Sequence, residues 1–184
     1  TEPAPAPVAP APVVEAARGH LLQQRVVPRR QVAAARWVAL AGERRFDEAY
    51  GLLQKVPLRE LDDPDDLLLA ADVARQAGRP AEAVPFLERV VKDHPRQTCA
   101  QLAGFSLGKV YLDSLDQPAL AAKAFAGVRQ AAPKGGLAQD ALAREVEAWS
   151  RAGDAARAHA TALEYVSLYP DGRRVAAVRV LGKL

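Results

Sequence analysis

Four alanines recur along the chain at nearly constant spacing, and each stands in the second half of a similar segment. They are Ala49, Ala83, Ala121 and Ala158, separated by 34, 38 and 37 residues. Larger residues follow each alanine at fixed distances. Four positions later come Leu53, Leu87, Phe125 and Ala162, and seven positions later come Val56, Val90, Val128 and Tyr165. A period of 20–50 residues is the signature of stacked structural repeats, so it constrains the fold more than any other feature of the chain.

Each repeated segment has the pattern of two helices joined by a short turn. The four segments span 34–56, 67–95, 102–133 and 142–170, and the last three close on Pro95, Pro133 and Pro170. An alanine where two antiparallel helices cross lets them approach closely, and the larger residues fill the space between neighbouring hairpins. Of the 184 residues, 39 are alanine and only 10 are aromatic, which favours helices over a β-sandwich. We predict an all-α, right-handed stack of about four hairpins, with the basic and apolar residues after 172 forming a capping helix.

Helix boundaries are marked by familiar residues. Asp-Asp-Pro at 62–64 and Asp-Gln-Pro at 116–118 place an acidic N-cap region before a proline. Gly78 and Gly153 suit the left-handed position that follows a helix, and Asp154 can cap the next helix. Pro85 falls inside the second helix of the second repeat, so we expect it to kink that helix or move its start.

With these features the chain resembles the tetratricopeptide repeat family over residues 29–184. The run Leu107-Gly108-Lys109-Val110-Tyr111 matches the family's signature for the first helix of a repeat. The chain departs from the pattern where Trp37, Ala71 and Val146 replace the usual small residue, and in the longer turn of the third repeat, residues 113–118. The resemblance implies binding of a protein or peptide partner by first helices that line a concave groove.

The first 28 residues differ from the rest of the chain. Five prolines alternate mainly with alanine over residues 1–14, which favours an extended polyproline II spacer, and residues 15–28 form a short lead-in segment. The spacer is interpreted either as a tail or as a stalk that joins residues 29–184 to another domain or to a membrane tether upstream.

A narrower resemblance concerns residues 137–184. Tyr-Pro-Asp-Gly at 169–172, followed by a short basic and apolar helix, is similar to the helical tails of FecR-type anti-sigma regulators and of Tol-Pal or outer-membrane assembly helpers. This resemblance implies a periplasmic or envelope-associated protein, with a cytoplasmic location as the alternative.

No motif predicts catalysis, a cofactor or a metal site. Gly-rich phosphate loops, HExxH and GxSxG are absent, Cys99 is the only cysteine, and three histidines are scattered along the chain. The aspartates around Pro64 are better explained by helix capping than by a cation. A net charge of +3 is too small to predict binding to nucleic acid.

Candidate partner-binding residues come from the first helices of the last two repeats. Asp140, Arg144, Glu147 and Arg151 are spaced by four, three and four residues, which puts them on one helical stripe. Such a stripe is either a solvated face or a surface that reads a charged peptide. Phe105 and Lys109 complete the predicted contact residues, together with Asp140, Arg144 and Glu147. Trp37 and Trp149 fill the core between hairpins or, alternatively, contact the partner at a rim.

The sequence therefore predicts a non-catalytic protein–protein interaction module of a bacterial envelope or signalling protein. Two other classes stay open: a structural spacer or homo-oligomerisation unit, and a regulatory domain of an upstream enzyme or sigma-factor regulator.

Overall fold

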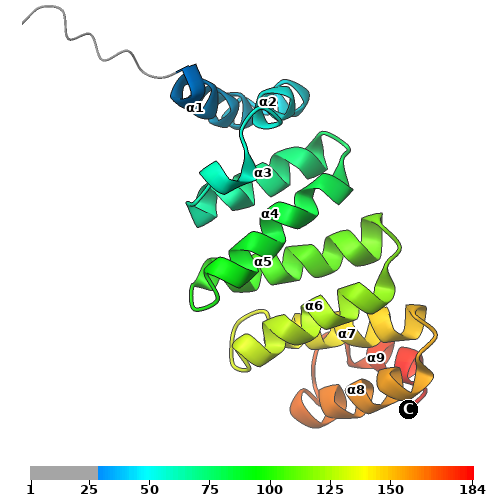
Figure 1. Ribbon diagram of the computed structural model, residues 1–184. Helices are drawn as coiled ribbons and strands as arrows, with labels where there is room; N and C mark the ends of the chain where they lie inside the picture. The colour runs from blue at the N-terminus through cyan, green and yellow to red at the C-terminus, as the bar shows by residue number, and fades with distance from the viewer. Residues whose placement is uncertain (1–28) are drawn as a thin grey trace, which may run out of the picture.

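The structure, a computed structural model, describes residues 29–184, and within these the side chains from Arg36 onwards. The predicted linker and lead-in segment, residues 1–28, lie outside the described part. Between Arg29 and Leu184 the chain forms α-helices and no strand. The helices follow one another as a stack of antiparallel pairs that ends in α9 (Figure 1). The predicted all-α stack of helical hairpins with a terminal helix is confirmed.

The helices divide into two sets by their place in the hairpins. The first helices are α1 (Arg29–Gly42), α3 (Pro64–Gln76), α5 (Thr98–Lys109) and α7 (Ala138–Arg151). The second helices are α2 (Phe46–Leu53), α4 (Pro80–Asp93), α6 (Pro118–Ala131) and α8 (Ala155–Leu168), and α9 (Val175–Gly182) follows. Contacts run along the chain, so each helix packs mainly against its predecessor and its successor. α9 packs against both α8 and α7 and closes the last hairpin.

The four recurring alanines are buried where the sequence predicts a close helix crossing. Their exposed fractions are 0–1%. The residues four positions later are also buried, and three of the four at the seventh position are buried, with Val56 half-buried. Trp37 and Trp149 lie in the core that runs from the first hairpin to α8, so their core-filling role is confirmed. A second cluster, which includes Tyr165 and Val178, joins α7, α8 and α9.

Most of the residues predicted to begin or end a helix do so in the structure. The Asp63 carboxylate accepts a hydrogen bond from the Asp65 amide at 2.8 Å, and the Asp154 carboxylate accepts one from the Arg157 amide at 3.0 Å. Gly78 and Gly153 have φ angles of 72° and 75°, the left-handed conformation that glycine adopts without steric cost.

One of these predictions needs correction, and one of two alternatives for Pro85 is excluded. Asp116 does not cap α6: the cap position is Gln117, and the Asp116 carboxylate instead pairs with Arg151 of α7 at 3.1 Å. Asp116 has a φ of 49°, in the turn that leads from the first to the second helix of the third hairpin. Pro85 does not move the start of α4, which begins at Pro80 and continues past Pro85 to Asp93.

The first and third hairpins depart from the common design. α2 has 8 residues whereas α4, α6 and α8 each have 14. After α2 the chain passes through a 3-10 turn, Leu58–Glu60, before α3. In the third hairpin α5 continues into a π-helical turn, Val110–Ser114, which accounts for the longer connection to α6.

Ala158→Leu tests the helix crossing in the last hairpin. Ala158 is 1% exposed, so three additional heavy atoms have no void to occupy. Overpacking of this kind typically costs about 1–3 kcal/mol of unfolding free energy. We expect a lower melting temperature with unchanged helical circular dichroism before the transition. Ala155→Leu, at the exposed first position of the same helix, is the control and should stay within about 0.5 kcal/mol of the parent. Equal melting of both variants would contradict the repeat register.

A pair of glycines offers a second test of close packing. A Cβ atom added at Gly108 of α5 would lie 2.6–2.8 Å from ring carbons of the fully buried Phe125. Gly108→Ala should therefore lower the unfolding free energy by about 1–3 kcal/mol in a urea titration. A Cβ at Gly127, in the exposed part of α6, meets no atom within 4 Å. Gly127→Ala should raise stability by up to about 1 kcal/mol, because alanine has the higher helix propensity.

Candidate protein-binding surface

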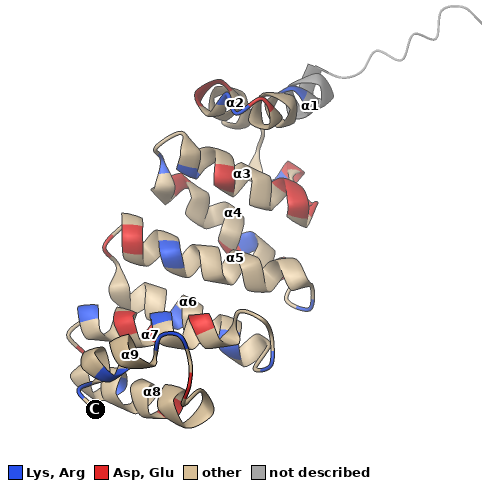
Figure 2. Ribbon diagram, turned by 180° about the vertical axis from the view of Figure 1, so that it is seen from behind, with Lys and Arg blue, Asp and Glu red and all other residues tan. Residues whose placement is uncertain are grey.

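The first helices α3, α5 and α7 follow one another on one side of the stack, the side facing the viewer in Figure 2. All five predicted contact residues belong to α5 or α7. Phe105 is half-buried, and its ring packs edge-to-face on Phe125 with 5.4 Å between centroids. Lys109, the last residue of α5, is exposed.

Arg144 in the middle of α7 joins two hairpins. Its guanidinium donates to both carboxylate oxygens of Asp113, at 2.7 and 2.5 Å, and to Glu147 at 2.8 Å. Asp113 belongs to the π-helical turn of the third hairpin. Arg144 therefore connects successive repeats, and its side chain is held in place by two carboxylates.

The two ends of the same stripe are paired in a similar way. Asp140, near the start of α7, accepts hydrogen bonds from Arg173 at 3.1 Å and from Arg174 at 3.3 Å, both in the segment before α9. Arg151, at the end of α7, pairs with Asp116. Every charged member of the predicted stripe thus has an intrachain partner of opposite sign.

These partners were not identified from the sequence. The longer turn at 113–118 was the available signal, because it carries two aspartates and lies one repeat before the stripe. Spacing alone cannot reveal the pairing with residues outside the stripe, since Asp113, Asp116 and Arg173 are 31–35 residues from their partners along the chain.

The surface formed by α3 and α5, on the same side of the stack, has a hollow and fewer ion pairs than the α7 stripe. A hollow of about 170 Å³ lies between the two helices. It is lined by Leu68, Ala71, Asp72, Arg75, Leu87, Leu102 and Ser106. Leu102 is 52% exposed and lies at the edge of this hollow. In the described part of the chain Lys109 has no hydrogen-bond or ion-pair partner. This region offers apolar surface and unpaired charge together.

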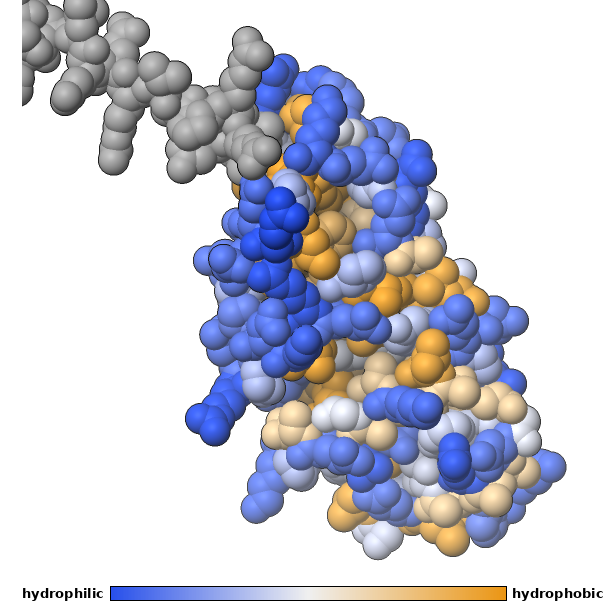
Figure 3. Space-filling view, viewed as in Figure 1, coloured by the Kyte–Doolittle hydropathy of each residue, from blue (hydrophilic) through white to orange (hydrophobic). Residues whose placement is uncertain are grey.

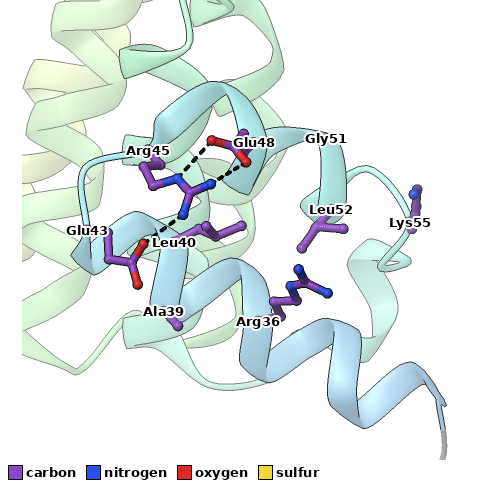
Figure 4. A pocket seen from close by; sticks show the side chains of 9 residues that line it. All are labelled: Arg36, Ala39, Leu40, Glu43, Arg45, Glu48, Gly51, Leu52 and Lys55. Carbon is purple, nitrogen blue, oxygen red and sulfur yellow. Dashed lines mark hydrogen bonds and ion pairs between the residues drawn. The ribbon is translucent and has the colours of Figure 1, made fainter.

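Two hollows of more than 500 Å³ lie elsewhere. One of about 610 Å³ lies between α1 and α2, where Arg45 binds Glu48 at 2.6 Å and Glu43 at 3.1 Å (Figure 4). Arg45, Glu43 and Glu48 are paired with one another, whereas Arg36 and Lys55 in the same lining form no ion pair within the described residues. The other, of about 540 Å³, lies between α2 and α4 and includes Val56, Leu58 and Phe86. It occurs where α2 is six residues shorter than the other second helices, and apolar atoms interrupt the hydrophilic surface on this side (Figure 3).

A buried charged cluster fixes the third hairpin to the fourth. Arg129 of α6 donates to Glu145 of α7 at 3.2 and 3.3 Å and to Glu164 of α8 at 2.7 Å. Glu145 is only 5% exposed and also accepts from the Trp149 indole at 3.4 Å. Burial raises the pKa of Glu145, and this effect exceeds the opposing influence of Arg129 and the Trp149 hydrogen bond.

Two further properties concern the described residues only. Their His, Cys, Asp and Glu side chains form no group of three that could hold a metal ion. None of the helices from α1 to α9 combines the length and apolarity needed to cross a membrane.

Comparison with known proteins identifies one of the hairpins. Residues 67–96, which contain α3 and α4, match the tetratricopeptide repeat family. No curated protein matches the chain. Together with the stack of hairpins, the match supports a tetratricopeptide-like repeat fold and the general role of such repeats in protein–protein interaction.

Removing Arg129 tests the buried cluster. Arg129→Met leaves the Glu145 carboxylate buried without a cation, which should cost about 3–5 kcal/mol of unfolding free energy at pH 7. The double variant Arg129→Met with Glu145→Gln should recover most of that loss, because no buried charge remains. Chemical denaturation of the parent, single and double variants measures this.

The same cluster predicts a pH effect of known sign. The folded-state pKa of Glu145 is above its ordinary value of 4.5, so the native state binds a proton that the unfolded chain releases. The destabilising contribution of ionised Glu145 is therefore present at pH 7 and disappears as the pH falls toward 4.5. The stability difference between the parent and Glu145→Gln should shift in favour of the parent over that range. A constant difference would contradict the assignment.

Proposed function

We propose that this stack of tetratricopeptide-like hairpins is a non-catalytic interaction module that binds a segment of another protein on its first-helix side. The observation that carries the proposal is the exposed Leu102 beside the α3–α5 hollow, with the unpaired Lys109 two turns further along α5. A rigid scaffold that presents apolar surface and free charge has little conformational entropy to lose on binding.

The predicted contact residues take different parts in this proposal. Phe105 and Lys109 belong to the part of the surface that meets the partner. Asp140, Arg144 and Glu147 hold α7 in position through their ion pairs and meet the partner only at their exposed edges. Binding is thus centred one repeat closer to the N-terminus than the α7 stripe.

The biological setting is a separate proposal. A place in the bacterial envelope or periplasm, a membrane tether upstream, and a role as the tail of a FecR-type regulator or a Tol-Pal or outer-membrane assembly helper rest on residues 137–184 and on the Pro/Ala-rich segment. A role as the regulatory domain of an upstream enzyme rests on the same features. The cytoplasm is the alternative compartment.

Self-association is the second candidate function, and one observation favours it. Val180 on α9 is 77% exposed, and Leu168 and Leu184 nearby in the C-terminal region are also exposed. A terminal repeat of a stack normally carries a polar outer face. Light scattering over a concentration range separates a monomeric binder from a homo-oligomer formed through this end.

Photo-crosslinking in the native host tests the proposed binding side. A photoreactive amino acid at Leu102 should capture a partner protein, whereas the same group at Leu163 of α8 should not. The two positions are matched, since both leucines are 52% exposed. Equal capture at both positions, or none at Leu102, would overturn the first-helix side as the binding surface.

A further inference from the structure

We infer that the hollow between α1 and α2, at the N-terminal end of the stack, binds a helix of another protein that carries acidic residues beside large apolar side chains. This surface is separate from the α3–α5 surface, so the inference goes beyond the proposed function. It follows from the shape of the hollow, from the charges that line it, and from the charges at the opposite end of the stack.

The hollow is an open groove between two antiparallel helices. It has a volume of about 610 Å³, and its lining residues come from α1, α2 and the turns that follow these helices. Leu40 is buried and Leu52 is half-buried, whereas the rest of the lining is exposed. Small-molecule sites bury most of the ligand surface, which a groove with such an exposed lining does not do. A helix that places apolar side chains in the groove fits this shape better.

Corresponding faces further along the stack are covered by a helix. α2 packs on α3, α4 packs on α5, and α6 packs on α7, so each later hairpin has a preceding helix against it. α3 contacts both α1 and α2 but lines no part of the hollow. The hollow therefore lies on a face that α3 does not cover, at the end of the stack that α1 and α2 form in Figure 1. Within residues 29–184, a helix added there would continue the packing of the later hairpins.

The charges that line the hollow are divided between its two ends. At one end Arg45 pairs with Glu43 and Glu48, so both carboxylates of the lining already have a partner. Figure 4 shows Arg36 and Lys55 at the other end. Neither of these two cations forms an ion pair within the described residues. The charge left without a partner in the hollow is therefore positive, which favours acidic side chains in the occupant.

The charge of Arg36 acts inside the hollow. The pKa of Glu48 is below its ordinary value of 4.5, mainly because the Glu48 carboxylate accepts hydrogen bonds from Arg45. Arg36 lowers the same pKa further through its charge, without an ion pair to Glu48. A partner carboxylate that enters the hollow beside Arg36 experiences the same attraction.

Charge also argues against a second copy of this chain as the occupant. The apolar surface exposed at the C-terminal end of the stack includes Val180 of α9, which is 77% exposed. Arg179 and Lys183 beside it are basic, and neither forms an ion pair within the described residues. Docking this end onto Arg36 and Lys55 would bring like charges together, which weakens association. The charges therefore favour a helix of a different protein.

Selection of peptides that need the hollow tests the inference. Random helix-forming peptides are displayed, selected on the full chain and depleted on Gly51→Trp, in which an indole fills the hollow without changing a charge. Gly51 is exposed, and a Cβ atom there meets no atom within 4 Å, so the fold accommodates the substitution. The recovered peptides should place aspartate or glutamate three or four residues from leucine, isoleucine, phenylalanine or methionine. Recovery of basic or purely apolar peptides, or of none that distinguishes the two proteins, would overturn the inference.

Charge variants connect a recovered peptide to the two cations. Arg36→Gln with Lys55→Gln should weaken binding of the fluorescent peptide at least about fivefold in anisotropy titrations and reduce its salt dependence. Lys92→Gln with Lys123→Gln is the matched control, because it removes two exposed, unpaired cations elsewhere and changes the net charge equally. Circular dichroism verifies that each variant is folded. Equal weakening in both double variants would mean that net charge alone drives binding and would contradict the site.

Further variants separate the other occupants and the proposed function. Leu102→Ser should leave the affinity for the recovered peptide unchanged, so the α3–α5 surface is decided separately by the photo-crosslinking experiment. The inference fails if Leu21→Ser with Leu22→Ser raises that affinity at least tenfold, because residues 15–27 of the chain would then be the occupant. It also fails if sedimentation equilibrium finds a dimer of the parent that Gly51→Trp dissociates, since the occupant would then be a second copy.

Discussion

Close approach of two helices at one small residue is the interaction on which the whole stack depends. Ala49, Ala83, Ala121 and Ala158 are almost fully buried, and each lies on the second helix of its hairpin. Glycines also allow close approach: a Cβ atom at Gly108 would collide with Phe125 between α5 and α6, and one at Gly182 would collide with Ala162 between α9 and α8. Because the helices touch through such small groups, one core runs from the first hairpin to α8, and a second cluster joins α7, α8 and α9.

Charged side chains add a second set of connections between successive hairpins. Arg129 reaches from α6 to α7 and α8, and Arg144 of α7 reaches back to Asp113. These bonds contribute specificity of position more than stability, because burying a carboxylate such as Glu145 has a desolvation cost that its partner must offset. The ion pairs also determine which charged side chains on the first-helix side have no partner. The C-terminal half of the first-helix side is paired internally, whereas the start of α3 and the end of α5 are not.

This uneven distribution gives the two halves of the stack different first-helix surfaces. The third and fourth hairpins are held together by ion pairs and present few unpartnered groups on the first-helix side. The second hairpin, which is also the one that matches the tetratricopeptide repeat family, lies beside the exposed Leu102 of α5. A partner that binds there meets a surface fixed by its neighbours, so binding requires little rearrangement of the scaffold.

The sequence by itself determined the fold class, the hairpin register and most helix ends, because these depend on local rules: periodic small residues, caps such as Asp63 and Asp154, and glycines with positive φ. It also identified the α7 stripe as one face of a helix. Only the tertiary structure decided what that face does, since the partners Asp113, Asp116 and Arg173 lie more than 30 residues away in the chain. Pairing between distant residues depends on the relative placement of whole hairpins and on the π-helical turn that aims Asp113. The spacing of residues within one helix gives no information about the placement of the hairpins or about the π-helical turn.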